Sequence, residues 1–224
     1  QHSIYEQALR DAGYEVIRLP DLADDPDAVF VEDTAILLGE HAVITRPGAA
    51  SRFEEIHSTA EGLKPYFTVH HLAAGTLDGG DVLKVGKTLY VGQSNRTDME
   101  GTKALEAKVF PLGYQVVPVE LGRCLHLKTA VTFAGKDREG RPTLLANPDW
   151  VDVRKFGGMA AIIVANGEPF AANVVRLHDR LIMAAGSPGT AAKLRERGFA
   201  VVEVDVSELQ KAEAGGTCMS LISD

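Results

Sequence analysis

Small clusters of polar residues recur along this chain at nearly even intervals, between runs of apolar residues. With Asp33, Asp78, His126, Asn173 and Cys218 as markers, the successive spacings are 45, 48, 47 and 45 residues in a chain of 224. A repeated period of roughly 20–50 residues is typical of one structural unit used several times. The period predicts five such units, and units closed into a ring would bring the five clusters together at its axis. The alternative is a coincidence among glycine-flanked strand ends.

Short β-type runs alternate with amphipathic helical patterns between these clusters, which predicts an α/β fold. The expected strands are Glu15–Leu19, Val29–Val31, Ala35–Leu38, Ala42–Thr45, Phe67–His70, Val82–Val85, Thr88–Val91, Tyr114–Val117, Ala130–Phe133, Thr143–Leu145, Ala161–Val164, Leu181–Ala184 and Ala200–Val204. The expected helices are Ile4–Ala12, Ser51–Leu63, Gly101–Phe110 and Thr190–Arg197. Each expected helix is followed by a β run, as in repeated αβ units.

Together the clusters supply a thiol, an imidazole and several carboxylates, the groups that nucleophilic catalysis uses. A cysteine attacks as its thiolate, and an imidazole titrates near neutral pH, so a Cys/His pair with a carboxylate that orients the histidine is chemically sensible. We therefore expect Cys218 to be the nucleophile, His126 to carry protons and Asp78 to orient His126.

A second set of acidic residues indicates the charge of the substrate. Asp27, Glu32 and Asp33 lie close together in the sequence. Paired carboxylates bind a planar guanidinium through bidentate hydrogen bonds. The sequence therefore predicts a cationic substrate.

Each of these residues also has a structural interpretation. Cys218 near the C-terminus could be a small buried apolar residue, and Asp78 before Gly79-Gly80 is a signal for a tight turn. A solvated helix start would account for Arg52. Cys124 lacks the spaced Cys/His partners of a metal site, so we interpret it as structural.

Charge and cysteine content exclude several classes of function. Lys and Arg number 23 against 31 Asp and Glu, a net charge of −8, and no five like charges are consecutive, which argues against nucleic acid and anionic membranes as partners. The most apolar stretch, Gly158–Ala165, is far below the ~20 residues of a membrane-spanning helix. Two cysteines and the absence of a signal-peptide pattern in Gln1–Arg10 predict the reducing cytoplasm.

Several ordered motifs, taken together, carry a family resemblance. They are Phe30-Val31-Glu32-Asp33, Ile44-Thr45-Arg46-Pro47-Gly48-Ala49, Ser51-Arg52, Thr76-Leu77-Asp78-Gly79-Gly80-Asp81-Val82-Leu83, Arg96-Thr97, Leu125-His126-Leu127-Lys128-Thr129 and Gly216-Thr217-Cys218-Met219-Ser220. In this order and at these separations, over essentially the whole chain, they resemble the dimethylarginine dimethylaminohydrolase (dimethylargininase) family of the guanidino-group-modifying, or pentein, superfamily.

The resemblance implies a single catalytic domain over residues 1–224, a five-bladed α/β propeller of ββαβ units. It implies hydrolysis of Nω-methylated arginine to citrulline and a methylamine through a covalent thiouronium on Cys218, with His126 as general acid and base and Asp78 as its partner. No metal or organic cofactor is implied. The residues that match the family's substrate contacts are Asp27, Glu32, Asp33, Arg52 and Arg96, with Ala212 as a main-chain contact. Of these, Arg52 and Arg96 match the pair that holds the α-carboxylate.

The expected partners are a small cationic guanidino substrate and, as an option, a second copy of the chain in a homodimer. Two departures from the family pattern stand out. Ser51-Arg52-Phe53 replaces Ser-Arg-Arg, and family members carry several tens of residues before the equivalent of Gln1, including a β-strand and a mobile loop. We therefore expect the sequence to belong to a longer protein and one propeller unit to lack its N-terminal strand.

Two other functions are compatible with the same motifs. Arginine deiminases and amidinotransferases share the Cys/His/acid chemistry, so plain arginine or another guanidine is an alternative substrate. A ribosome anti-association factor uses the same five-unit fold for binding alone, although a scaffold has no need for Cys218, His126 and Asp78 at matching points of three units.

Overall fold

The computed structural model describes residues 1–212 and 215–223, whose contacts divide them into two compact units. The first, which we call the β1–β6 unit, contains Arg18–Leu121, Leu125–Leu127 and the residues from Cys218 onward. Its elements are η1 (Val31–Thr34), β1 (Ala35–Leu38), β2 (His41–Ile44), η2 (Ala50–Arg52), α2 (Glu55–Leu63), β3 (Thr68–His71), η3 (Gly79–Asp81), β4 (Val82–Val85), β5 (Thr88–Gln93), α3 (Met99–Val109), η4 (Phe110–Leu112) and β6 (Gln115–Glu120), where η is a 3-10 turn.

The second, the β7–β12 unit, contains Gln1–Ile17, Gly122–Cys124 and Lys128–Thr217. Its elements are α1 (His2–Asp11), β7 (Val131–Lys136), β8 (Pro142–Ala146), η5 (Val153–Lys155), β9 (Ala160–Ile163), β10 (Val174–Arg176), β11 (Leu181–Ala184), α5 (Pro188–Glu196), β12 (Val201–Val204) and α6 (Ser207–Gln210). Two short elements, α4 (Leu127–Ala130) and η6 (Thr217–Met219), contain residues of both units.

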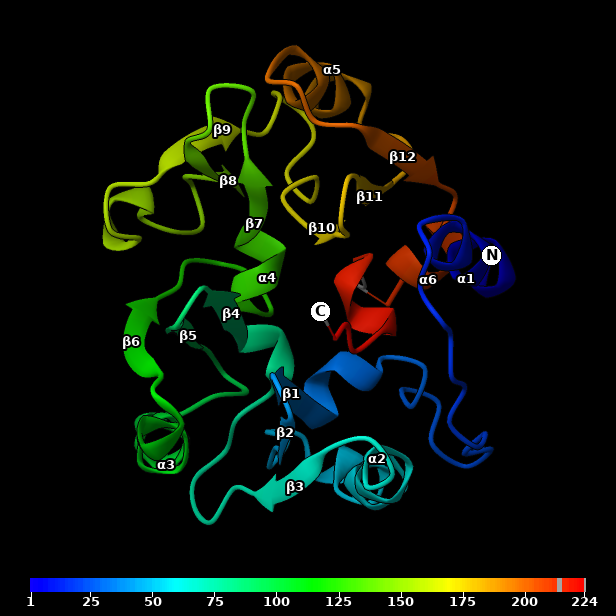
Figure 1. The fold of residues 1–224 in the computed structure, drawn as a ribbon, viewed down its shortest axis with the longest axis vertical. Coiled ribbons are helices and arrows are strands. Elements are labelled where there is room, and N and C mark those ends of the chain that lie inside the picture. The colour runs from blue at the N-terminus through cyan, green and yellow to red at the C-terminus, as the bar shows by residue number, and fades with distance from the viewer. Residues whose placement is uncertain (213–214, 224) are drawn as a thin grey trace. The chain divides into compact units, whose positions relative to one another are not determined.

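One plan is repeated in four three-stranded sheets, two in each unit (Figure 1). In every sheet an antiparallel hairpin is followed by a third strand that runs parallel to the second. Helices α2, α3 and α5 connect the second strand to the third in three of the sheets, and η5 lies in the fourth connection. The α/β fold and the repeated unit are thereby confirmed, whereas five blades, their closure into a propeller and a missing N-terminal strand stay predictions.

The hairpins and the core follow directly from the local sequence. Two-residue turns at Gly39-Glu40 and Gly86-Lys87 each begin with a glycine at positive φ, 63° and 59°, which suits tight hairpins. Strand β1 is apolar at every position because both of its faces are covered. Ile36 and Leu38 pack with β4, β5 and α3, while the other two residues of β1 pack toward α2.

In the β1–β6 unit, buried carboxylates connect successive repeats. The backbone N–H of Gly80 donates to Asp33 Oδ1 at 3.0 Å, and the N–H of Leu127 donates to Asp81 Oδ1 at 2.9 Å. The two bonds span 47 and 46 residues, which is the period of the sequence. A polar side chain is therefore required at the start of each repeat, because it satisfies a buried N–H of the next one.

Uncharged side chains form the equivalent connections in the β7–β12 unit. Asn173 Oδ1 accepts from the N–H of Thr217 at 3.0 Å, and its Nδ2 donates to Thr217 Oγ1 and to the Lys128 carbonyl. Thr132 Oγ1 accepts from the N–H of Val174 at 3.4 Å. The sequence markers thus stand at or just before the first strands of the sheets, and Cys218, the last marker, lies in η6.

Two expected strands are wrong. Glu15–Leu19 pairs with no strand among the described residues, and an extended segment needs a neighbouring edge to form a sheet. Val29–Val31 is a turn, since the Phe30 N–H bonds to the Asp27 carbonyl and the Asp33 N–H to the Phe30 carbonyl. The structure also contains a short strand, β10, that was not predicted, and divides the expected helix Ser51–Leu63 into η2 and α2.

No helix within the described part of the chain combines the length and the apolar character needed to cross a membrane.

We predict that Asn173→Ala destabilises the protein by about 2–4 kcal/mol, because it removes two buried hydrogen bonds to Thr217 and a partly buried one to the Lys128 carbonyl. Urea denaturation measures the loss. Asn166→Ala, at an exposed position, is the matched control and should change stability by less than about 0.5 kcal/mol. Equal effects of the two substitutions would contradict the role of the connection between repeats.

Candidate active site

His126 and Asp78, expected as partners, are in contact. The Nε2–H of His126 donates to Asp78 Oδ2 at 3.0 Å, and the two side chains are 8% and 0% exposed. The other carboxylate oxygen of Asp78 accepts from the N–H of Gly48 at 2.8 Å. With both of its oxygens engaged, Asp78 holds the imidazole ring in one orientation.

The second nitrogen of His126 faces another carboxylate. Nδ1 lies 3.9 Å from Asp33 Oδ1 and forms no hydrogen bond with a described residue, so it is the nitrogen that can exchange a proton with a ligand. The His126 ring and the Asp33 carboxylate can approach this closely because a residue without a side chain, Gly80, lies beside them. A Cβ on Gly80 would lie 2.7 Å from Asp33 Oδ1 and 2.8 Å from His126 Nδ1. Gly79 is equally constrained, since its Cβ would lie 2.0 Å from the Glu32 carbonyl oxygen.

The protonation of His126 is set by this surrounding charge. Burial disfavours the imidazolium, but the charge of Asp33, the hydrogen bond to Asp78 and the charges of Asp81 and Asp78 outweigh it and raise the pKa of His126 to about 9. At neutral pH the ring is therefore an imidazolium, ready to act as an acid.

Arg52 is a buried part of the same network. It donates to Asp33 Oδ2 at 2.5 Å, to both carboxylate oxygens of Glu55 and to the carbonyls of Phe30 and Asp27. Burial lowers the pKa of Arg52, but the hydrogen bonds and charges of the Glu55 and Asp33 carboxylates outweigh it. The net effect raises the pKa of Arg52 above its ordinary value. Most of its donors are thus engaged by the protein, and its expected contact with a substrate carboxylate stays a prediction.

The other expected contact residues differ in exposure. Glu32 is buried in η1, Asp27 is exposed, and Arg96 is partly buried on the loop after β5. The loop of Arg96 packs on Gly48, where a Cβ would lie 2.4 Å from the Arg96 carbonyl oxygen. Ala212 belongs to the β7–β12 unit and its N–H donates to the Leu209 carbonyl, and its expected main-chain contact with a substrate stays a prediction.

Cys218 lies in η6, is partly buried and belongs to the same unit as His126 and Asp78. Three residues later, Leu221 packs against apolar residues of β1, β2 and α2, so the segment that follows Cys218 is anchored to this unit. The attack of Cys218 on a ligand held near His126 stays a prediction.

Negative charge exceeds positive charge in the interior of the β1–β6 unit. The buried acids are Glu32, Asp33, Glu55, Asp78 and Asp81, and the buried basic residues described in this unit are Arg52 and His126. Buried charges are normally paired. A guanidinium matches carboxylates in shape and charge, so this excess is compatible with a cationic ligand.

Asp33, Asp78 and His126 are also the one group of three possible metal-ligating side chains identified in the described chain, with ligand atoms all within 4.8 Å of one another. The hydrogen bond between His126 and Asp78 accounts for much of this proximity without an ion.

Three residues of the network were not assigned a role from the sequence: Asp81, Glu55 and Ser94. Glu55 stands three residues after Arg52, the spacing of a helical ion pair, and could have been found from that signal. Asp81 was visible in Asp78-Gly79-Gly80-Asp81 only as part of a turn pattern, and Ser94 carried no signal. Phe53, where the family pattern has a second arginine, lies under the Arg46 guanidinium at 6.0 Å from its ring centre.

The chain is similar to known enzymes over nearly its whole length. The chain is 36% identical over 224 residues to N(G),N(G)-dimethylarginine dimethylaminohydrolase of Pseudomonas aeruginosa and 39% identical over 225 residues to that of Streptomyces coelicolor, with 99% of this chain covered in both and 86% and 84% of the relatives. No family model matches the chain.

Solved structures of two enzymes superpose closely on this chain. The Pseudomonas aeruginosa enzyme, as a cysteine-to-serine variant complexed with citrulline, superposes with a TM-score of 0.91 at 34% identity, over 97% of this chain and 85% of that one. The N-terminal domain of ArgZ, an arginine dihydrolase from cyanobacteria bound to its substrate, superposes with a TM-score of 0.84 at 25% identity, over 98% and 84%.

We predict that stability falls as the pH rises from about 6.5 to about 9. The pKa of His126 is 6.5 in a model peptide and about 9 in the fold, so the folded state holds the proton more tightly. The stabilisation is complete below the lower value and is lost as the pH passes the higher one. The midpoints of urea denaturation, measured across this pH range, test the prediction. The variant His126→Asn should not show the decrease in stability. A decrease of the same size in that variant would contradict the assignment.

A second prediction separates the two expected carboxylate-binding arginines. Arg52→Ala should cost about 3–5 kcal/mol of stability, because it strands the buried carboxylates of Asp33 and Glu55. Arg96→Ala should cost less than about 0.5 kcal/mol, since the Arg96 guanidinium forms no ion pair with a described residue. Chemical denaturation of both variants measures this, and equal losses would show that Arg52 is not held as the structure indicates.

Proposed function

Because the chain belongs to the dimethylarginine dimethylaminohydrolase family, whose members with solved structures share its pentein fold, we propose that it hydrolyses Nω-methylated arginine to citrulline and a methylamine. The observation that carries this proposal is the buried excess of carboxylates beside a protonated His126. Together they offer charge for a bound guanidinium and an acid for its leaving group.

Binding activates a substrate that is otherwise a poor electrophile. A guanidinium is stabilised by resonance, so it has to be held with its central carbon presented to a strong nucleophile. Asp33 and Glu32 take the substrate's N–H groups in this proposal, Asp27 adds a polar contact at the exposed side, and Arg96 holds the α-carboxylate. Arg52 shares that last role or keeps Asp33 in place.

Attack by the Cys218 thiolate forms a sulfur–carbon bond at the guanidinium carbon. His126 then gives its Nδ1 proton to the methylated nitrogen, the carbon–nitrogen bond breaks and a methylamine leaves, with the remaining amidine bound to sulfur as a thiouronium. The neutral imidazole next takes a proton from water as the water adds to the same carbon. The sulfur–carbon bond then breaks and the hydroxyl proton passes to solvent, which releases citrulline and restores the thiolate.

The bound cation also favours the form of Cys218 that reacts. A positive charge near a thiol lowers its pKa, so the substrate itself promotes formation of the thiolate. Asp78 serves this cycle by keeping Nδ1 of His126 directed to the ligand through the bond to Nε2. The cycle needs no metal or organic cofactor. We propose that a single domain over residues 1–224 carries out this cycle and that it acts in the cytoplasm.

Plain arginine is the second candidate substrate, favoured by the likeness to an arginine dihydrolase. In that reaction the leaving group is ammonia, and the same residues would carry the same steps. Pocket shape around the methylated nitrogen decides between the two substrates. A binding function without turnover is the remaining alternative within this fold.

We predict that Cys218→Ser lowers citrulline release by at least about 10³-fold, because the covalent step loses its nucleophile. Release is measured in parallel from asymmetric dimethylarginine, monomethylarginine and arginine, and Cys124→Ser is the matched control that should keep full activity. Turnover of arginine alone would reassign the protein as a deiminase. No turnover of any guanidine would contradict catalysis, and full activity of Cys218→Ser would contradict the nucleophile.

A further inference from the structure

Asp81 is a fully buried carboxylate next to the proposed catalytic residues, yet it has no part in the cycle described above. Its Oδ1 accepts from the N–H of Leu127 at 2.9 Å, and its Oδ2 accepts from the hydroxyl of Ser94 at 2.6 Å. Leu127 directly follows His126 in the chain, and Ser94 begins the loop that carries Arg96. One carboxylate therefore joins the two segments that carry the proposed acid and the proposed carboxylate-binding residue.

Ser94 extends this connection to the rest of its loop. While donating to Asp81, its Oγ accepts from the N–H of Arg96 at 3.0 Å and from the N–H of Thr97 at 3.2 Å. Thr97 Oγ1 in turn accepts from the N–H of Asp78 at 3.1 Å. Asp78 in turn bonds to His126, which directly precedes Leu127 in the chain. The contacts that start at Asp81 therefore form a closed ring.

The backbone of β5 lies close to the carboxylate of Asp81. A Cβ on Gly92 would lie 2.8 Å from Asp81 Oδ1 and 2.9 Å from the Leu127 Cβ. Backbone therefore packs directly against the carboxylate, and the glycine in β5 is required by this close approach. Burial raises the pKa of Asp81 to about 6, although His126, the Ser94 and Thr97 hydroxyls and the Leu127 N–H act in the opposite direction, so the carboxylate is mainly ionised at neutral pH.

We propose that Asp81 is a positioning residue of the active site, which sets the place of His126 through the Leu127 N–H and the place of Arg96 through the Ser94 hydroxyl. This inference rests on the proposed function. A connection between repeats with no further role would affect only stability. A positioning role predicts altered kinetics in protein that remains folded, with each end of the carboxylate affecting a different kinetic constant.

Three substitutions separate the two ends. In Asp81→Asn the amide oxygen still accepts from the Leu127 N–H, but the amide nitrogen cannot accept from Ser94, whose oxygen already accepts from two N–H groups. Ser94→Ala breaks the same contact from the other side and leaves the Leu127 bond intact. Both should loosen the loop of Arg96, whereas Asp81→Ala also releases the segment of His126.

Steady-state kinetics with monomethylarginine, and with methylagmatine as the analogue that lacks the α-carboxylate, test the proposal. For Ser94→Ala we expect KM for monomethylarginine to rise about tenfold with little change in kcat, and no change in KM for the analogue. Asp81→Asn should raise KM in the same way, while the loss of its negative charge also lowers the pKa of His126 and shifts the pH profile of kcat. For Asp81→Ala we expect kcat to fall about 100-fold as well, because a shift of about 1 Å in a catalytic group has an effect of this size. Far-UV circular dichroism and thermal unfolding establish which variants are folded.

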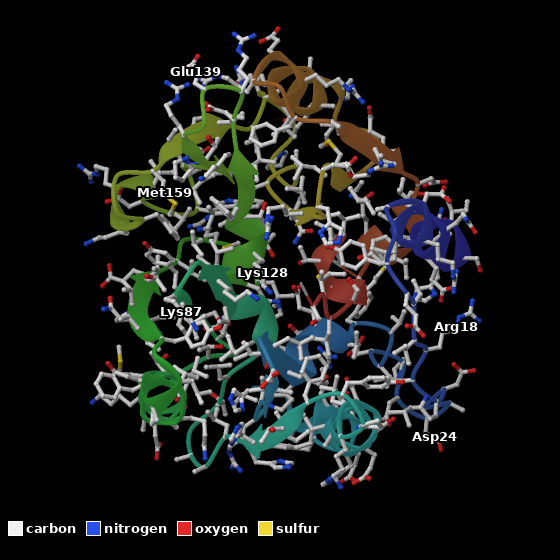
Figure 2. The ribbon with its side chains drawn as sticks, viewed as in Figure 1. Arg18, Asp24, Lys87, Lys128, Glu139 and Met159 are labelled. Carbon is white, nitrogen blue, oxygen red and sulfur yellow. The ribbon has the colours of Figure 1, made fainter. Side chains whose placement is uncertain are left out.

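Asp137→Asn is the matched control. Asp137 is a buried carboxylate of the β7–β8 hairpin, where it accepts from the N–H groups of Glu139 and Arg141 and from the Arg141 guanidinium; Figure 2 labels Glu139 on the turn of this hairpin. It should lower stability and leave both kinetic constants unchanged.

Unchanged kcat and KM in folded Asp81→Asn and Ser94→Ala, with an active parent protein, would overturn this inference alone. An equal rise of KM for both substrates would also overturn it, because the effect would not act through Arg96. A parent protein that turns over no guanidine would overturn the proposed function and this inference with it.

Discussion

A buried side-chain oxygen that accepts a backbone N–H from the following repeat is the contact on which the described fold depends. An N–H enclosed in the protein without an acceptor costs stability, so each repeat has to place a polar residue where the next one begins. Asp33, Asp81 and Asn173 meet this need. The even spacing of polar clusters in the sequence is the consequence.

The same contacts determine where the chemistry lies. The N–H groups that they bind belong to Gly80, Leu127 and Thr217, and each lies within two residues of a proposed catalytic residue in the sequence. Structural and catalytic requirements therefore converge on the same short segments. This convergence explains why the charge is high there: the carboxylates that join repeats also raise the pKa of His126.

Charge balance supports the class of ligand proposed for the site. Arg52 neutralises part of the negative charge of Asp33 and Glu55, and the protonated His126 offsets part of that of Asp78. The remaining excess is a general property of the site, independent of whether the ligand nitrogen is methylated. The proposed class of ligand thus rests on electrostatics and on likeness to the relatives, while discrimination between methylated and plain arginine depends on the contacts of a few atoms.

The repeat, the α/β class and the pairing of His126 with Asp78 were predictable from the sequence, because each leaves a pattern of residue types. Glu15–Leu19 was wrong as a strand, since its apolar residues say nothing about whether a partner edge lies beside it. The burial of Arg52 could not be predicted either, because most of its hydrogen-bond partners are brought to it only by folding. They include Phe30, Asp33 and Glu55. The role of Asp81 required the geometry of Ser94 and Leu127, which no local pattern encodes.

The proposed covalent cycle is tested most directly by acid quenching of the protein during turnover of asymmetric dimethylarginine, followed by mass spectrometry of its peptides. The account predicts an adduct on the peptide that contains Cys218, with the mass of the substrate less dimethylamine. Turnover with no adduct on any cysteine, or with an adduct on Cys124 instead, would contradict it.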